Sequence, residues 1–159
     1  MRKLLALLLA AVLPVAGLAY YAGIEIVPHS FASATYGIPY VIVGYNSGPG
    51  FAHIGLSNPL TINGWYMAKA GGFYAITQSL RISGHFAVWG EIQNFAFTGG
   101  AWTVGTGGDY TLDRSLAVFL DFNIPPAVPP GAPFWGMWIT VGFRFYFGLP
   151  STAPEKAGS

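Results

Sequence analysis

Residues 134–147 read Phe-Trp-Gly-Met-Trp-Ile-Thr-Val-Gly-Phe-Arg-Phe-Tyr-Phe, and the stretch alternates between an apolar and a mixed face. The apolar face carries Trp135, Met137, Ile139, Val141, Phe143, Phe145 and Phe147. The mixed face carries Gly136, Trp138, Thr140, Gly142, Arg144 and Tyr146. A period of two residues is the period of a β-strand. Since a tilted strand of about 9–11 residues crosses a bilayer, the stretch predicts a membrane-spanning strand with Arg144 on its inner face.

The composition points in the same direction. Charged residues make up 8% of the chain and aromatic residues 16%, whereas soluble domains carry about 25% charged residues. After Ala19, Gly, Pro, Ser, Asn and Thr interrupt every apolar run, so the roughly 20 apolar residues of a spanning helix are lacking. A closed β-barrel is the other structure that leaves no backbone group unpaired in lipid. The sequence therefore favours an all-β, eight-stranded, antiparallel, up-and-down transmembrane barrel.

Further features exclude other classes of protein. Without the basic residues of its first segment the chain is nearly neutral, so it has no positive field with which to bind nucleic acid. The chain has no cysteine, which excludes a disulfide framework and thiolate chemistry. The histidines His29, His53 and His85 are widely separated, which gives no metal-ligand spacing. We expect no metal and no cofactor.

The N-terminal segment has the pattern of a secretory signal peptide. Arg2 and Lys3 precede an apolar run, and small residues end it at Ala19. An uncleaved membrane anchor is the alternative, but the run is short and Pro14 interrupts it. We predict a signal peptide over residues 1–19, a barrel domain over 20–147 and a disordered tail over 148–159.

Turn residues divide the barrel domain into eight segments. We predict strands at 20–28, 36–45, 50–57, 64–77, 84–97, 101–112, 115–125 and 134–147. An even number of strands places both termini on the periplasmic side of the membrane. Within the second segment, Pro39 removes one ladder hydrogen bond, which predicts a bulge.

The alternation places most charged side chains on the inward face. An eight-stranded barrel has an interior just wide enough for side chains to fill it. We therefore expect these groups to pair with one another and not to line a wide channel. The predicted lumen network contains Glu25, Lys69, His85, Glu91, Asp121 and Arg144, and the same parity places His53 and Asp109 inside.

Aromatic residues gather near the predicted strand ends, where membrane barrels carry aromatic girdles at headgroup depth. A soluble β-sandwich with these aromatics in its core is the alternative. The predicted girdle contains Tyr20, Tyr45, Trp65, Tyr66, Trp102, Trp135 and Phe147.

The signal segment, the eight strands, the short inner turns and a final strand that closes on Phe147 together resemble the small outer-membrane barrels of the OmpA/OmpX type. The resemblance covers nearly the whole mature chain. It implies a location in the cell outer membrane, contact with outer-membrane lipid, and the barrel-insertion machinery as a partner that reads the closing aromatic. It also implies roles from envelope integrity to adhesion, solute passage and lipid-modifying catalysis, without choosing among them.

The sequence supports a catalytic site only weakly. His29 and Ser30 lie in the first predicted outer loop, and Glu25 precedes them on the first strand. Adjacency alone does not make a catalytic triad, so a polar loop pair is the favoured interpretation and we predict a non-enzymatic protein. The expected function is a structural or envelope role, or a narrow route for small solutes. The alternatives are a lipid-acting enzyme, a barrel for a small apolar ligand, and a secreted soluble β-sandwich or lipocalin-like binder; the oligomeric state is left open.

Overall fold

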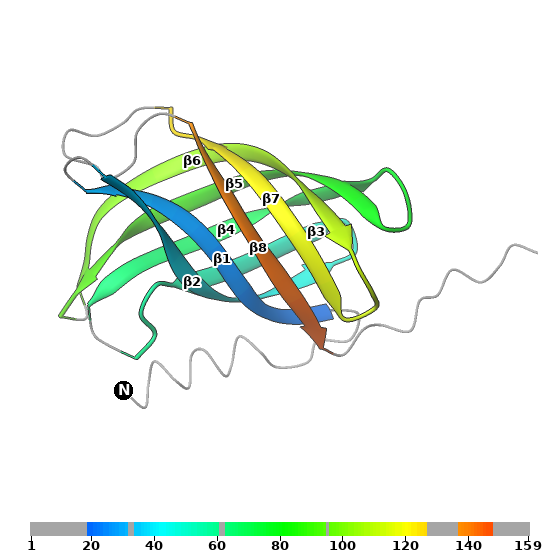
Figure 1. The fold of residues 1–159 in the computed structure, drawn as a ribbon, viewed down its shortest axis with the longest axis horizontal. Coiled ribbons are helices and arrows are strands. Elements are labelled where there is room, and N and C mark those ends of the chain that lie inside the picture. Colours follow the sequence, from blue (N-terminus) through cyan, green and yellow to red (C-terminus); the bar gives the residue numbers. More distant parts are fainter. Residues whose placement is uncertain (1–18, 32–33, 61–62, 95, 127–136, 148–159) are drawn as a thin grey trace, which may run out of the picture.

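The computed structural model describes residues 19–31, 34–60, 63–94, 96–126 and 137–147. They form a closed barrel in which neighbouring strands lie side by side and are steeply tilted (Figure 1). The strands are β1 Ala19–Phe31, β2 Ala34–Ser47, β3 Gly50–Leu56, β4 Gly64–Ala75, β5 Leu80–Gln93, β6 Ala96–Thr111, β7 Leu116–Ile124 and β8 Trp138–Phe147. Within the described ranges, no helix is long and apolar enough to span a membrane.

Each strand pairs antiparallel with its neighbour in the sequence, and β8 returns to pair with β1. In the closing pair, Tyr20 lies opposite Phe147 and Ile26 opposite Val141. The sheet is thereby closed, which removes the free edges that would otherwise expose unpaired backbone groups. The predicted eight-stranded antiparallel barrel is confirmed, and the two separate sheets of a sandwich are excluded.

The barrel has two unlike ends. Residues Ala19 and Phe147 lie at the same end as the β2–β3, β4–β5 and β6–β7 turns, which we name the inner end (Figure 1). The opposite ends of the strands, from Phe31 and Ala34 to Ile124 and Trp138, define the outer end.

Some strand boundaries differ from those expected. Strand β5 begins at Leu80 instead of residue 84, and β6 begins at Ala96 instead of residue 101. Residues 98–100, which lie between the predicted strands 84–97 and 101–112, are therefore part of β6. The ladder shifts by one residue there, since Trp89 pairs with Ala101 while Glu91 pairs with Thr98. This extra residue on β6 is a β-bulge.

The bulge predicted at Pro39 is absent from the continuous β1–β2 register. The outermost pair of β2 with β3 is Val41 with Leu56, so Pro39 lies where β2 extends beyond β3. Its missing N–H therefore removes no hydrogen bond to β3, which is the position in a sheet where proline is tolerated.

Side chains alternate between the lumen and the outer wall along every strand. Strand β7 shows the pattern most clearly, because Ala117, Phe119, Asp121 and Asn123 are buried while the residues between them are exposed. The exposed partners are large and apolar, as lipid contact requires. They include Val118, Leu120, Phe122 and Ile124 on β7 and Ile139, Val141 and Phe145 on β8.

Candidate functional site: the filled lumen

The centre of the lumen is occupied by one ammonium group between two carboxylates. Lys69 Nζ on β4 donates to Glu25 Oε1 on β1 at 2.6 Å and to Asp121 Oδ2 on β7 at 2.8 Å. The three side chains are at most 1% exposed. Thr140 on β8 donates to the same Glu25 oxygen at 2.7 Å. We name Glu25, Lys69, Asp121 and Thr140 the middle cluster; it ties together four strands.

An imidazole and a phenol extend the middle cluster. His53 Nε2 lies 3.4 Å from Glu25 Oε2, and His53 Nδ1 is hydrogen-bonded to the Tyr21 hydroxyl at 2.8 Å. Both rings are almost fully buried. The linked carboxylate, imidazole and hydroxyl resemble a hydrolase triad in the types of group present, but this set of side chains is buried within the barrel. These contacts hold the His53 imidazole in one orientation and give the buried Tyr21 hydroxyl a hydrogen-bond partner.

A second ion cluster lies nearer the inner end. The guanidinium groups of Arg144 and Arg81 both donate to Asp109 Oδ2, the latter at 3.1 Å. Arg81 also donates to the Tyr146 hydroxyl at 3.2 Å. Arg144 is 1% exposed and Arg81 is 23% exposed, so Arg81 reaches toward the mouth. We name Arg81, Asp109 and Arg144 the inner cluster.

Aromatic rings surround the inner cluster. The Arg144 guanidinium lies 4.1 Å from the centre of the Phe119 ring and 5.3 Å from that of Tyr21. Arg81 lies 4.2 Å from the centre of the Phe73 ring. Stacking on an aromatic face stabilises a desolvated cation, so the rings compensate for the excess of positive groups over carboxylates here.

On the outer side of the middle cluster the lumen contains buried aromatic and apolar side chains. The rings of Trp89 and Trp138 pack edge to face with their centroids 5.7 Å apart, and the centroids of the Tyr40 and Trp89 rings are 6.3 Å apart. Trp89 Nε1 donates to Thr103 Oγ1 at 3.0 Å. We name Tyr40, Met67, Trp89 and Trp138 the outer plug; all four are buried, between 0% and 6% exposed.

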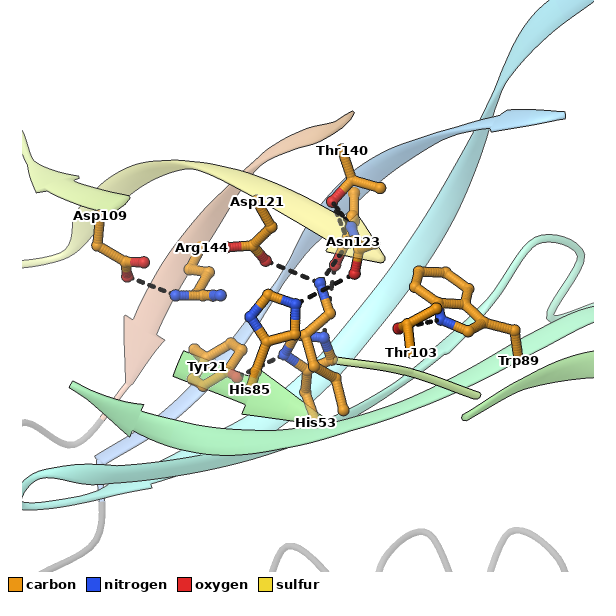
Figure 2. A network of polar contacts seen from close by, with 12 residues as sticks. Tyr21, His53, His85, Trp89, Thr103, Asp109, Asp121, Asn123, Thr140 and Arg144 are labelled. Atoms are coloured by element: carbon orange, nitrogen blue, oxygen red, sulfur yellow. Dashed lines mark hydrogen bonds and ion pairs between the residues drawn. The ribbon is translucent and has the colours of Figure 1, made fainter. Parts of the chain in front are cut away.

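Strand β8 shows the order of these layers along the barrel. From the outer end inward, its lumen-facing side chains include Trp138 of the outer plug, Thr140 of the middle cluster and Arg144 of the inner cluster. Figure 2 shows the same order, with Trp89 and Thr103 at one side of the polar network and Asp109 with Arg144 at the other. The lumen is thus filled in layers.

The residues expected in the lumen occupy different positions in these layers. Glu25, Lys69 and Asp121 are in direct contact, while Arg144 belongs to the separate inner cluster. His85 is bound to the amide oxygen of Asn123 at 3.1 Å. The expected place of Glu91 in the network is not observed: it lies half-buried opposite Trp65, and the ion pairs among the described residues do not include it.

Several members of the network were not singled out by the sequence. The alternation placed His53 and Asp109 inside but gave no partner for either. Arg81 was missed because it lies between the predicted strands 64–77 and 84–97, whereas β5 begins at Leu80. Tyr21 and Thr140 carry no charge, and only the three-dimensional arrangement reveals their bonds.

Of the residues expected in the girdle, some lie on the outer wall of the barrel and one packs against the lumen residues. Tyr20 lies between Tyr45 and Phe147 on three adjacent strands, and this row faces outward at the inner end. Trp65 instead packs against the buried lumen residues, so its assignment to the outer wall is corrected. Of the others, Tyr66 meets Phe97 edge to face, Trp102 is exposed on the wall within β6, and Trp135 is outside the described residues.

Small residues make room for the network. An added Cβ at Gly107 would collide with the Asp121 carboxylate, and one at Gly105 would collide with the His85 ring. Glycine at these positions therefore lets a large side chain cross the lumen from the neighbouring strand. A hollow of about 490 Å³ lies on the wall, lined mostly by outward-facing residues that include Ala22, Ala52 and Ala68.

The arrangement offers little chemistry beyond binding among its own groups. No group of His, Asp and Glu side chains in the described part of the chain could hold a metal ion. The side chains of His29 and Ser30 lie outside the described residues, although their backbone belongs to β1. The lumen is a buried ionic network, enclosed by aromatic side chains.

No protein-family model matches the sequence, and a search of curated proteins finds no match. Among solved structures, the chain is similar to Neisserial surface protein A, with 14% identity, a TM-score of 0.42 and coverage of 83% of this chain and 98% of that one. It is also similar to OmpT, an outer membrane protein of Vibrio cholerae, with 12% identity, a TM-score of 0.32 and coverage of 84% and 53%. Likeness at this level is weak, so the barrel architecture rests on the chain's own strand pairing and outer face.

Proposed function

We propose that this chain is a non-enzymatic, integral outer-membrane barrel with a structural role in the cell envelope and a lumen that does not conduct solutes. The observation that carries the proposal is the layered lumen. The middle cluster joins four strands, and the outer plug and the aromatic rings of the inner half cover it on both sides.

The outer wall supports the membrane placement. Large apolar side chains point outward from the central part of the strands, and the charged side chains of the described strands point toward the lumen or lie at the strand ends. A wall of this kind would aggregate in water, but it meets the requirement of a bilayer. Inside the barrel, the buried ion pairs join strands β1, β4, β7 and β8 beside a cluster of buried aromatic and apolar side chains.

The proposal predicts that the folded protein does not conduct ions across a bilayer. The mature chain, residues 20–159, would be refolded in mild detergent, and its slower or faster gel migration before boiling would verify closure. In planar bilayers we expect no single-channel steps from the wild type. Conductance steps in the wild type would contradict a sealed lumen and would support the narrow solute route.

Matched tryptophan variants sharpen the test. The double change Trp89→Ala and Trp138→Ala removes two rings of the outer plug, whereas Trp102→Ala removes a ring from the lipid-facing wall, where Trp102 is 48% exposed. We expect an increased leak from the first variant only. An equal leak from both would mean that general loosening, and not the plug, controls passage.

A further inference from the structure

A hollow of about 490 Å³ indents the outer wall of the barrel. A row of paired residues crosses it in the order Tyr45, Ala52, Ala70 and Phe86, on β2, β3, β4 and β5. The two methyl groups thus form a floor between two aromatic rings. Ala68, two residues away along β4, extends this floor toward the outer end. We name the hollow with these five residues the wall groove.

Toward the inner end, the wall beyond this floor carries three glycines. Gly50, Gly72 and Gly84 lie opposite one another on β3, β4 and β5. A Cβ added at Gly84 would meet no atom within 4 Å, and one added at Gly72 would lie 3.5 Å from its nearest atom, which is an ordinary contact. Among the described glycines, only Gly48 has a positive φ. Neither packing within the described chain nor backbone conformation therefore requires glycine at positions 72 and 84.

The glycines of the lumen differ in this respect. A Cβ added at Gly71, for example, would collide with the backbone oxygen of Gly84. A glycine within a strand weakens the strand, and it often marks a site where a ligand or another backbone approaches closely. The wall glycines therefore indicate that space on this side of the barrel accommodates a molecule outside the chain.

The lining of the wall groove is apolar. Lys69 and His53 also border the hollow, but their side chains are buried in the lumen, where both make polar contacts. The row of Tyr20, Tyr45 and Phe147 borders the groove on the side nearest the inner end. Aromatic residues of a membrane protein gather at headgroup depth. The groove therefore faces the hydrocarbon layer of the leaflet at the inner end.

The length of the groove selects its occupant. From Ala68 to Gly72, β4 advances by four residues, which is about 13 Å at roughly 3.3 Å per residue. The hydrocarbon core of a bilayer is about 30 Å thick, so one leaflet contributes about 15 Å. A protein helix that crosses the membrane would need the full thickness, whereas an acyl chain of one leaflet matches the groove.

The volume of the groove fits the same occupant. If a methylene group takes about 30 Å³, as a water molecule does, a hollow of 490 Å³ accommodates roughly 16 methylene groups. A second copy of the chain is a poorer match, because a two-fold interface on this face would place hollow against hollow. Association in lipid depends on close van der Waals packing, and an unfilled hollow loses those contacts. A flexible acyl chain can fill it.

We propose that the wall groove binds one acyl chain of a phospholipid from the leaflet at the inner end, and that this lipid stays with the barrel when the surrounding bilayer is removed. The inference rests on the proposed membrane placement and adds to it a specific lipid-binding site.

The test counts the phospholipids that remain bound after extraction. The mature chain, residues 20–159, is folded into vesicles of palmitoyl-oleoyl phosphatidylcholine, extracted in mild detergent and weighed intact by native mass spectrometry. The filled variant, Ala70→Leu with Gly84→Leu, places side chains in the groove and at its inner end. The control variant, Val118→Phe with Val141→Phe, adds a similar volume to the exposed wall of β7 and β8.

We expect one bound phospholipid on the wild type and on the control variant. When phosphatidylcholine is titrated back, the filled variant should bind it about tenfold more weakly, which corresponds to the loss of about ten carbon contacts. The denaturant midpoint of the filled variant should not fall, because Ala70 is exposed and a Cβ at Gly84 meets no atom. A purely structural role for these small residues would lower the midpoint and leave lipid binding unchanged.

A phosphatidylcholine with a photoreactive group in the middle of its palmitoyl chain locates the bound lipid. After extraction, cross-links should concentrate in the proteolytic fragments that contain Ala52 and Ala70. Cross-links spread evenly over the fragments of all the strands would contradict a single site.

The inference would be overturned by a wild type that retains no phospholipid, or by a filled variant that binds as tightly as the wild type. A wild-type dimer that the filled variant abolishes would assign the groove to a second copy and would also overturn it. Gel mobility before and after boiling verifies the closure of every sample, and Gly84→Leu alone replaces the double variant should that variant not close. A chain that closes in no vesicle would refute the membrane barrel itself, whereas a closed wild type without bound phospholipid would refute only the lipid site.

Discussion

Removal of the Lys69 ammonium group provides the most direct test of the filled lumen. In Lys69→Met the apolar stem is kept, while Glu25 and Asp121 lose the group that lies 2.6 and 2.8 Å from their oxygens. Both carboxylates are at most 1% exposed, so water does not replace the lost partner. Breaking a buried ion pair from one side costs about 3–5 kcal/mol. We expect a loss of that size in the free energy of unfolding.

Two matched variants separate charge from packing. The triple change Lys69→Met, Glu25→Gln and Asp121→Asn removes all three charges with little change in volume. It should be more stable than Lys69→Met alone, because an uncharged set leaves no uncompensated ion. Arg81→Met breaks a partly exposed pair whose carboxylate keeps Arg144 as a partner, and we expect a cost of about 0–1 kcal/mol.

The assay is a denaturant titration of the protein folded in lipid vesicles, followed by tryptophan fluorescence and by gel mobility. The midpoint and slope give the free energy of unfolding when the two signals coincide. If Lys69→Met cost less than about 1 kcal/mol, the value for a solvated ion pair, the middle cluster would be exposed to water. The lumen would then be open to water, which would contradict the proposal that it does not conduct solutes.

Three further changes test the wall, the plug and a turn. Leu120→Lys, in the middle of the lipid-facing side of β7, should cost about 2–4 kcal/mol in vesicles, while Leu112→Lys beside the β6–β7 turn should cost about 0–1 kcal/mol; equal costs would contradict the membrane placement. Trp89→Ala should cost about 3–5 kcal/mol in the same titration because the ring is 1% exposed, and a smaller cost would mean that the plug is loosely packed. The pKa of Asp113 is lowered because its carboxylate accepts hydrogen bonds from the backbone and hydroxyl of Ser115. The stability that it adds should be present above about pH 4, the ordinary value, and lost as the pH falls through the lowered pKa, so that the free energies of the wild type and Asp113→Ala converge in acid; a difference that persists there would refute this assignment.

The alternation of the sequence was sufficient to predict the fold because each spanning strand must satisfy two different solvents. In β8, lipid requires Ile139, Val141 and Phe145 outside, and this leaves Thr140 and Arg144 for the lumen. A period of two residues therefore encodes both the strand and its orientation. The start of β5 was harder to predict, because its first residues, from Leu80 to Ile82, are mostly exposed and are equally compatible with a loop.

The partners within the lumen could not be predicted in the same way. Lys69 and Asp121 are 52 residues apart in the chain, and their approach depends on the stagger of every strand between them. Alternation fixes which face a residue occupies but not its height in the barrel. For this reason the parity of Glu91 agreed with a lumen position, while its height near the outer end separates it from the ionic groups.

The positions of the ion clusters along the barrel axis also indicate that they help to select the register between strands β8 and β1. A slip of β8 by two residues against β1 would keep every apolar side chain facing lipid, so the alternation does not by itself select the register. The same slip would move Thr140 away from Glu25 and Arg144 away from Asp109, which would leave both carboxylates buried without these donors. Such a loss is costly where water is excluded. The lipid-facing residues thus determine that the chain forms a barrel, and the middle and inner clusters select the register at which its last strand closes it.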